Sequence, residues 1–195
     1  DEFAYLIDTC QQGGKVKTGL KNLELARNEK GQMSSKNMSY IIANRKESVI
    51  LKDAIITAIK NNAEDYLNPP IKNIGYKGIE KTSKAISKWF ERSSDIKKDL
   101  TLVALLMEKA GTGGSLFRNL YRDFLKESLE IYPNEHIEKG YRKFCDIALK
   151  WFEVSSLINK AGETAEKKYL SRASDILKEL SLAEKEAMLE LRKIK

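Results

Sequence analysis

From residue 48 onward, apolar side chains recur every three or four positions, the spacing of helices that each bury one face. Polar, Gly- or Pro-containing stretches separate the periodic segments, and the loops are short enough to favour antiparallel neighbours. The pattern therefore predicts a helical bundle of about six helices. Their expected ranges are 48–67, 82–92, 96–110, 115–131, 134–159 and 164–194.

Several boundary signals support this division. Ser48 is a residue type that caps helix N-termini, and Pro69 disfavours helical geometry in the residue before it. Gly75 and Gly78 are expected to flank a turn, and Gly162 is expected to interrupt the helical pattern.

Residues 1–47 have a different pattern. Phe3 to Ile7 reads as a short apolar strand ending at Asp8, and a second extended piece follows around Val16. A short helix is expected over 20–27 and a further strand over 39–43. The fold class is thus mainly α, with an α+β segment over 1–47 and a helical domain over 48–195.

Composition narrows the function classes. The 195 residues carry 35 basic and 28 acidic side chains, one His and two Cys, with a formal charge of +7. No apolar run is long enough to span a bilayer, and the Cys and His spacing fits neither a disulfide framework nor a zinc site. We therefore expect a cytoplasmic protein that binds no metal and no membrane. The basic excess lies before residue 99 without interleaved exposed aromatic residues, so a solvated surface is favoured over nucleic-acid binding.

Few residues offer nucleophilic or acid–base chemistry. Asp8 could orient a catalytic imidazole from a rigid strand end, although an Asp there more often forms a turn. Cys10 has only His136 as an imidazole partner, and His136 is expected in an exposed first turn of a helix. Cys145 falls on an apolar helix face and is expected to act as a small hydrophobic residue.

A glycine-rich corner precedes the helix over 115–131. Gly113 and Gly114 could present free N–H groups to an anion, and Arg118 and Arg122 could add charge one turn later. A tight connection between two helices would need the same glycines without any ligand. The two Trp-Phe pairs are expected to be core aromatics, with a ligand-lining role as the alternative. They are Trp89-Phe90 and Trp151-Phe152.

Three segments resemble a known family. GTGGSLFRNLYRDFLKES (111–128), NIGYKGIEKTSKAISKWFE (73–91) and YRKFCDIALKWFEVSSLI (141–158) are similar to the C-terminal helical domain of the butirosin biosynthesis protein H family. FAYLIDTCQQG, near the N-terminus, resembles the last strands of that family's papain-like, C39-peptidase-like domain. The resemblance implies that residues 1–47 are a short remnant of such a domain.

The resemblance also implies an activity. It is acyl transfer from an acyl carrier protein thioester to an amine, through a Cys-His-Asp triad. Asp8 matches the acid by position, whereas the Cys and His would lie upstream, in the chain's own N-terminal half. A phosphopantetheine arm on the carrier would be received at Gly113, Gly114, Arg118 and Arg122, and no cofactor of the chain's own is expected.

Two alternatives remain open from the sequence. The helical domain could be a non-catalytic binding module, for example a homodimer formed through the long final helix. The chain could also belong to a peptide-processing cysteine peptidase.

Overall fold

The computed structural model describes residues 2–8, 14–31, 34–41, 48–109 and 113–195. The chain forms two compact units, Asp1–Ser48 and Val49–Lys195. This division lies one residue beyond the boundary expected from the change in hydrophobic pattern.

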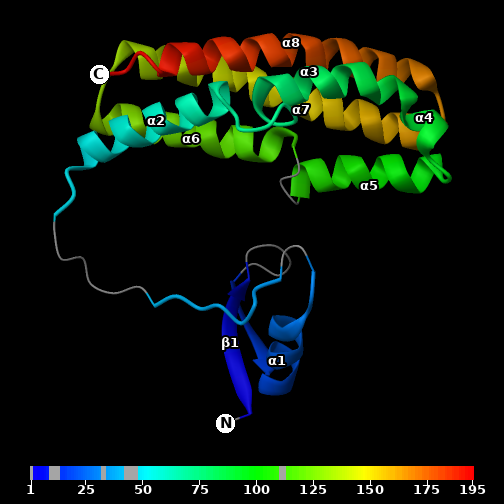
Figure 1. Ribbon diagram of the computed structural model, residues 1–195, viewed down its shortest axis with the longest axis horizontal. Helices are drawn as coiled ribbons and strands as arrows, with labels where there is room; N and C mark the ends of the chain where they lie inside the picture. Colours follow the sequence, from blue (N-terminus) through cyan, green and yellow to red (C-terminus); the bar gives the residue numbers. More distant parts are fainter. Residues whose placement is uncertain (1, 9–13, 32–33, 42–47, 110–112) are drawn as a thin grey trace. The chain divides into compact units, whose positions relative to one another are not determined.

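The first unit contains a two-stranded antiparallel sheet and a helix (Figure 1). Strand β1 (Phe3–Asp8) pairs with β2 (Gly14–Gly19), and α1 (Leu20–Asn28) follows β2 directly. The register places Phe3 opposite Gly19 and Asp8 opposite Gly14. Two strands alone are marginally stable in water and need a further layer to bury an apolar face.

One face of this sheet is exposed and combines aromatic, aliphatic and basic side chains. Phe3, Tyr5 and Ile7 alternate along β1 and so share a face, and all three are exposed. Lys17 and Lys15 on β2 lie over the Phe3 and Tyr5 rings, with Nζ atoms 3.9 and 4.5 Å from the ring centroids. Within the described residues of the unit, the lysines lie over the two rings, and no strand or helix covers this face.

The strand expected over 39–43 is wrong for the residues described. Residues 39–41 have no regular secondary structure, Tyr40 and Ile41 are exposed, and residues 42–43 lie outside the described part. A strand requires a ladder partner, and no described strand pairs with this segment.

The second unit is helical, and the chain as described is mainly α, as predicted. Its elements, in order, are α2 (Leu51–Leu67), α3 (Gly75–Ala85), a 3₁₀ turn η1 (Ile86–Lys88), α4 (Trp89–Arg92), α5 (Ile96–Lys109), α6 (Ser115–Ile131), α7 (Glu135–Thr164) and α8 (Lys167–Leu191).

The long helices α7 and α8 lie side by side and form the centre of this unit (Figure 1). Helices α5 and α6 pack on α7, whereas α2 and α3 pack on α8. The apolar stripe of α8, which includes Leu177 and Leu191, is buried inside the unit. Gly140 allows the close approach, because a Cβ there would lie 2.4 Å from Leu191 Cδ2.

Three boundary predictions are wrong, for identifiable reasons. Helix α2 begins at Leu51, and its N-cap residue, Ile50, provides no side-chain cap, so Ser48 does not start it. Gly78 lies inside α3, where a Cβ would come 2.4 Å from the Asn73 carbonyl oxygen. Gly162 lies inside α7 against Thr101 of α5, so it serves close helix packing and ends nothing.

Candidate functional site

The most buried charged side chain of the helical unit is Glu184 on α8, at 1% exposure. Arg118 of α6 donates to both carboxylate oxygens, from Nε to Oε1 at 2.9 Å and from Nη2 to Oε2 at 3.1 Å. Trp151 of α7 donates its indole N–H to Oε1, and Tyr66 of α2 donates its hydroxyl to Oε2. Each oxygen thus accepts two hydrogen bonds, which fills the acceptor capacity of the carboxylate.

This cluster joins four helices around one ion pair. The Arg118 guanidinium carbon lies 4.5 Å from the centroid of the Trp151 ring, a cation–π geometry. Burial raises the pKa of Tyr66 well above its usual range, and the neighbouring Glu184 carboxylate raises it further. Tyr66 therefore remains a protonated donor, and the pair of opposite charges is neutral overall.

A cavity of about 500 Å³, open to solvent, adjoins the cluster. Tyr66, Arg118 and Glu184 contribute to its lining, and side chains from α2, α6, α7 and α8 complete it. Phe117 and Leu120 on α6 also line it and are more than half exposed. Both residues have the helical spacing that predicts one buried face over 115–131, and the structure shows that this prediction is wrong for these two residues.

Tyr121 forms part of the cavity wall. Its ring meets Phe144 edge-on at a centroid distance of 4.8 Å and stacks near Phe124 at 5.9 Å. Its hydroxyl is buried and has no hydrogen-bond partner among the described residues. Burial raises the pKa of Tyr121, so the hydroxyl stays protonated at neutral pH.

The glycine-rich corner is engaged by an internal carboxylate. The backbone N–H of Ser115 donates to Glu108 Oε1 at 3.1 Å, and the Ser115 hydroxyl donates to the other oxygen. Gly113 and Gly114 have positive φ values of 142° and 75°, and a Cβ on Gly114 would lie 2.7 Å from the Met107 carbonyl oxygen. The glycines therefore allow a tight connection between α5 and α6, and the Glu108 carboxylate of α5 accepts the hydrogen bonds of Ser115 at the first residue of α6.

The two arginines of the corner have different partners. Arg118 faces Glu184, whereas Arg122 donates from Nε to Asp123 Oδ1 at 2.8 Å and from Nη1 to Asn119 Oδ1 at 2.6 Å. The structure thus brings Arg118, but not Arg122, to the cavity. A role of these residues in receiving a phosphopantetheine arm stays a prediction.

The predicted triad residue lies in the other unit. Asp8 is the last residue of β1, opposite Gly14, and its side chain is outside the description. Cys10 also lies outside the described residues. Cys145 is partly buried on α7, in keeping with a packing role.

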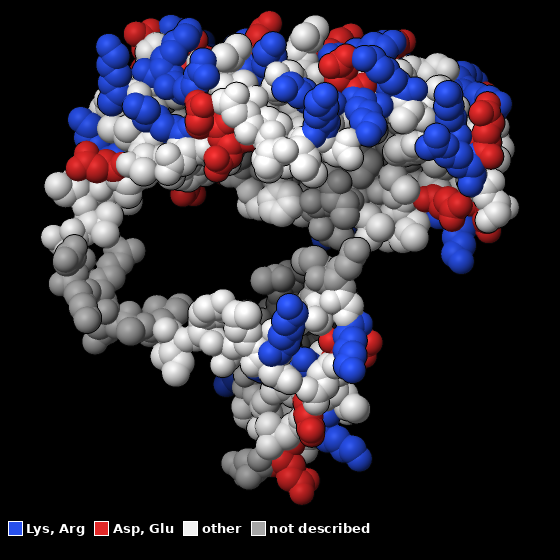
Figure 2. All heavy atoms as spheres, in the orientation of Figure 1, with Lys and Arg blue, Asp and Glu red and all other residues white. Residues whose placement is uncertain are grey.

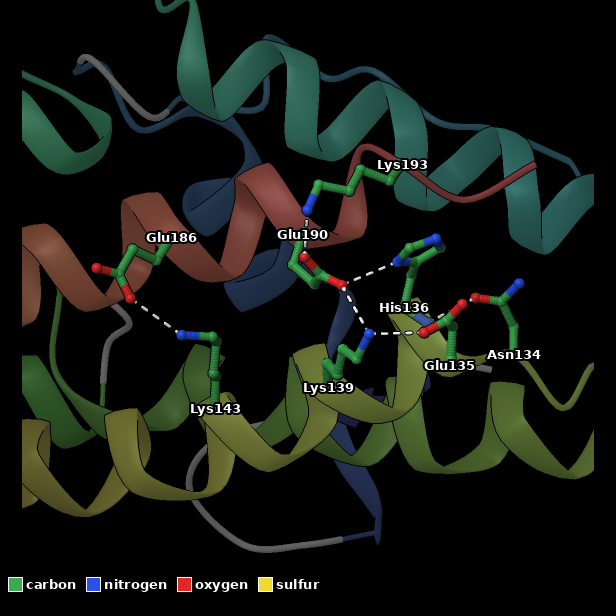
Figure 3. Close-up of polar contacts among 8 residues, drawn as sticks. All are labelled: Asn134, Glu135, His136, Lys139, Lys143, Glu186, Glu190 and Lys193. Carbon is green, nitrogen blue, oxygen red and sulfur yellow. Dashed lines mark hydrogen bonds and ion pairs between the residues drawn. The ribbon is translucent and has the colours of Figure 1, made fainter.

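A second polar cluster surrounds the single histidine (Figure 3). His136 Nδ1 lies 2.9 Å from Glu190 Oε1, Lys139 Nζ lies 3.6 Å from the same atom, and Lys193 Nζ lies 2.6 Å from Glu190 Oε2. Hydrogen bonds from Lys193 and His136 lower the pKa of Glu190 to about 2. Asn134 caps α7 by accepting from the backbone N–H of His136 at 2.9 Å.

The His136 side chain is about three-quarters buried and contacts Glu190, so the prediction that it lies in an exposed turn is wrong. Its contacts tie the start of α7 to the end of α8, a structural role. Among the described residues, no group of His, Cys, Asp and Glu side chains is arranged to hold a metal ion.

The surface charge is mixed. Figure 2 shows Lys and Arg side chains distributed over the helical unit with acidic side chains between them. Lys77, Lys81, Lys84 and Lys88 are all exposed along α3 and η1, and Lys84 pairs with Glu80 at 2.5 Å. Within the described residues, no helix has the length and apolar character that crossing a membrane requires.

A protein-family model, described as a domain of unknown function (DUF4872), matches residues 21–191. The chain belongs to this family. The DUF4872 match begins within α1 and extends through α8, so it includes the cavity and leaves β1 and β2 outside. Neither the curated proteins nor the solved structures contain a match.

Sequence reasoning missed Glu184 and Tyr66. Glu184 lies four residues after Leu180 and seven before Leu191, in the apolar stripe of α8, and an acid in such a stripe is a signal of a buried pair. Trp151 was predicted in the core and is buried there, while Phe152, predicted beside it, is 59% exposed.

Proposed function

We propose that the chain is the C-terminal part of a cytoplasmic, cysteine-dependent acyltransferase of specialised metabolism, resembling the butirosin biosynthesis protein H family. In this proposal the helical unit serves as a binding domain. The first unit contributes Asp8 to a catalytic domain that the protein's own N-terminal half completes. The observation that carries the proposal is the incomplete sheet. The described sheet has two strands, and Phe3, Tyr5 and Ile7 lie exposed on it beside Lys15 and Lys17, as expected where further sheet or helix packs in a larger domain.

The family match supports the same division in part. It includes every helix of the helical unit and leaves β1 and β2 outside, although it begins within α1 of the first unit and so crosses the boundary between the two units. Asp8 stands at the end of its strand, the position from which an acid orients an imidazole in a triad.

The proposed reaction has two balanced steps. A Cys of the N-terminal half, deprotonated by a His that Asp8 orients, attacks the thioester carbonyl, and the carrier's phosphopantetheine thiol leaves with that proton. The amine of the acceptor then attacks the acyl-enzyme, an amide bond forms, and the Cys thiol is restored by the proton that the amine loses.

A protein extended to include the upstream coding sequence tests this. It would be incubated with an acyl thioester of N-acetylcysteamine, which mimics the end of the arm, and analysed by intact mass. We expect one acyl group on an upstream Cys. Asp8→Asn should slow acylation by a factor on the order of 10² or more, whereas Asp53→Asn, on the first turn of α2, should not. An extended protein without an acyl adduct, or full-rate Asp8→Asn, would show the proposal to be wrong.

A second candidate, a non-catalytic binding module, is favoured by one observation. Glu184, the buried carboxylate at the cavity, has four donors and no free lone pair to act as a base. Absence of acylation together with ligand binding at the cavity would favour this candidate.

A further inference from the structure

Glu184 and Arg118, the two charged residues that line the cavity, differ in the hydrogen-bonding capacity that they have left. Glu184 accepts four hydrogen bonds and has no acceptor capacity left. Arg118 uses Nε and Nη2 on Glu184, and Nη1 lies 3.5 Å from the Gly114 carbonyl oxygen. Of the five guanidinium N–H groups, two thus lack an acceptor among the described residues. Arg118, which lines the cavity, therefore has charged N–H groups left that can donate to a ligand.

The paired charges of Arg118 and Glu184 favour a ligand whose hydrogen-bond acceptor is neutral. Arg118 and Glu184 cancel each other, so an anionic ligand would lose its hydration next to a cation that is already paired. An amine would meet the guanidinium, find the carboxylate fully used, and have only neutral acceptors such as the Asn62 amide left in the lining. A carbonyl oxygen needs only a donor, and hydrogen bonds from a charged donor are the stronger kind.

The apolar lining of the cavity favours a ligand that is itself mostly apolar. Among the lining residues, Phe144 is buried and Phe124 is partly buried. Phe117 and Leu120 are 54% and 57% exposed, so they lie at the opening of the cavity. Apolar walls with a few convergent polar groups, at a volume of about 500 Å³, are typical of small-molecule sites. The Tyr121 hydroxyl is fully buried in the wall and is therefore no contact for a ligand.

We propose that this cavity binds an apolar or aromatic acyl group, whose neutral carbonyl oxygen accepts from Arg118 while its body lies against Phe117 and Leu120. The assignment rests on the proposed function for its biological meaning, because it gives the cavity to the acyl group and not to the amine acceptor. The binding itself depends only on the helical unit.

Three probes of similar size test the ligand class: phenylacetamide, phenylacetate and phenethylamine, which are neutral, anionic and cationic. Each would be titrated into the 195-residue chain and followed by calorimetry or protein NMR. We expect phenylacetamide to bind at least about fivefold more tightly than either charged probe, equivalent to roughly 1 kcal/mol. Acetamide, which lacks the ring, should not bind measurably.

Two matched variants test whether phenylacetamide binds in this cavity. Phe117→Ala should weaken phenylacetamide about fivefold or more, because it removes a ring at the opening. Phe152→Ala removes the same side chain at a similar exposure, 59%, outside this cavity, and should leave the affinity unchanged. Both positions are exposed, so both variants should fold.

The inference is wrong if phenylacetamide does not bind, if a charged probe binds as tightly, or if Phe117→Ala and Phe152→Ala behave alike. These outcomes are separate from the acylation test. Binding can fail while the extended protein still forms an acyl-enzyme, and acylation can fail while the cavity still binds phenylacetamide.

Discussion

Replacing Glu184 by Gln tests whether the buried ion pair holds the helical unit together. The change preserves shape and removes the negative charge. A Gln amide places an NH₂ group where one carboxylate oxygen accepts two donors, either Arg118 with Trp151 or Arg118 with Tyr66. Only the Tyr66 hydroxyl can rotate to accept from that NH₂ group, so the amide should turn toward Tyr66 and leave one Arg118 N–H unpaired.

The magnitude follows from this arrangement. Removing one partner of a buried pair costs about 3–5 kcal/mol, since the other charge stays uncompensated. The side chain of Arg118 is 18% exposed, and the carbonyl oxygen of the introduced amide would still accept from one side. We therefore expect a loss of about 3 kcal/mol in the free energy of unfolding.

Urea unfolding followed by tryptophan fluorescence measures this loss. Both tryptophans of the chain, Trp89 and Trp151, lie in the helical unit, so the signal reports that unit alone. With a urea dependence of about 1–3 kcal/mol per molar, the midpoint should fall by about 1–3 M.

Glu186→Gln is the matched control on the same helix. Glu186 accepts from Lys143 at 3.0 Å, and the side chains of Glu186 and Lys143 are 64% and 41% exposed, so the loss of this pair should cost less than about 1 kcal/mol. If Glu184→Gln and Glu186→Gln shifted the midpoint equally, the ion pair would not stabilise the unit as argued.

Three further changes have defined outcomes. Tyr121→Phe should raise the free energy of unfolding by about 1 kcal/mol, measured by urea, because it removes a buried hydroxyl without a partner; a loss would reveal a partner for that hydroxyl. Gly140→Ala should lower the melting temperature, since its Cβ would lie 2.4 Å from Leu191 Cδ2, at a cost of about 1–3 kcal/mol; Gly31→Ala, with no atom within 4 Å, should not. The lowered pKa of Glu190, about 2 against 4.5, means that its stabilising effect is complete above pH 4.5 and is lost as the pH falls toward 2. The stability difference between the native chain and Glu190→Gln should therefore shrink from pH 5 to pH 2.5 in thermal melts, and a constant difference would contradict this reasoning.

The helices could be predicted where burial alone decides the pattern. Helices α5 and α6 begin where expected, because each has a buried stripe and a clear end signal. The glycines misled the prediction at Gly78 and Gly162, since a helical glycine that allows close packing looks like a breaker in sequence. Phe152 and Phe117 share the spacing of buried residues, and only the arrangement of helices determines that both are exposed.

The candidate site was predicted only in part. Arg118 was singled out as an anion-binding residue, and the structure gives it an internal carboxylate, Glu184, from a helix 66 residues away. Sequence separation of this kind hides pairings, because nothing local links the two positions. The triad interpretation of Asp8 was reached through resemblance and position, and its backbone placement at a strand end is compatible with that role.

The lining of the cavity also limits where chemistry can occur. Four of its side chains are of ionisable types, and none has the free lone pair that a general base needs at neutral pH. Arg118 offers N–H donors and no acceptor, Glu184 accepts four hydrogen bonds, and burial raises the pKa of Tyr66 and Tyr121. His136, the single histidine, is engaged by Glu190 instead. A base acting on a ligand held here must come from outside the described lining, which is why a binding role for the helical unit and a catalytic role for a separate domain form one consistent proposal.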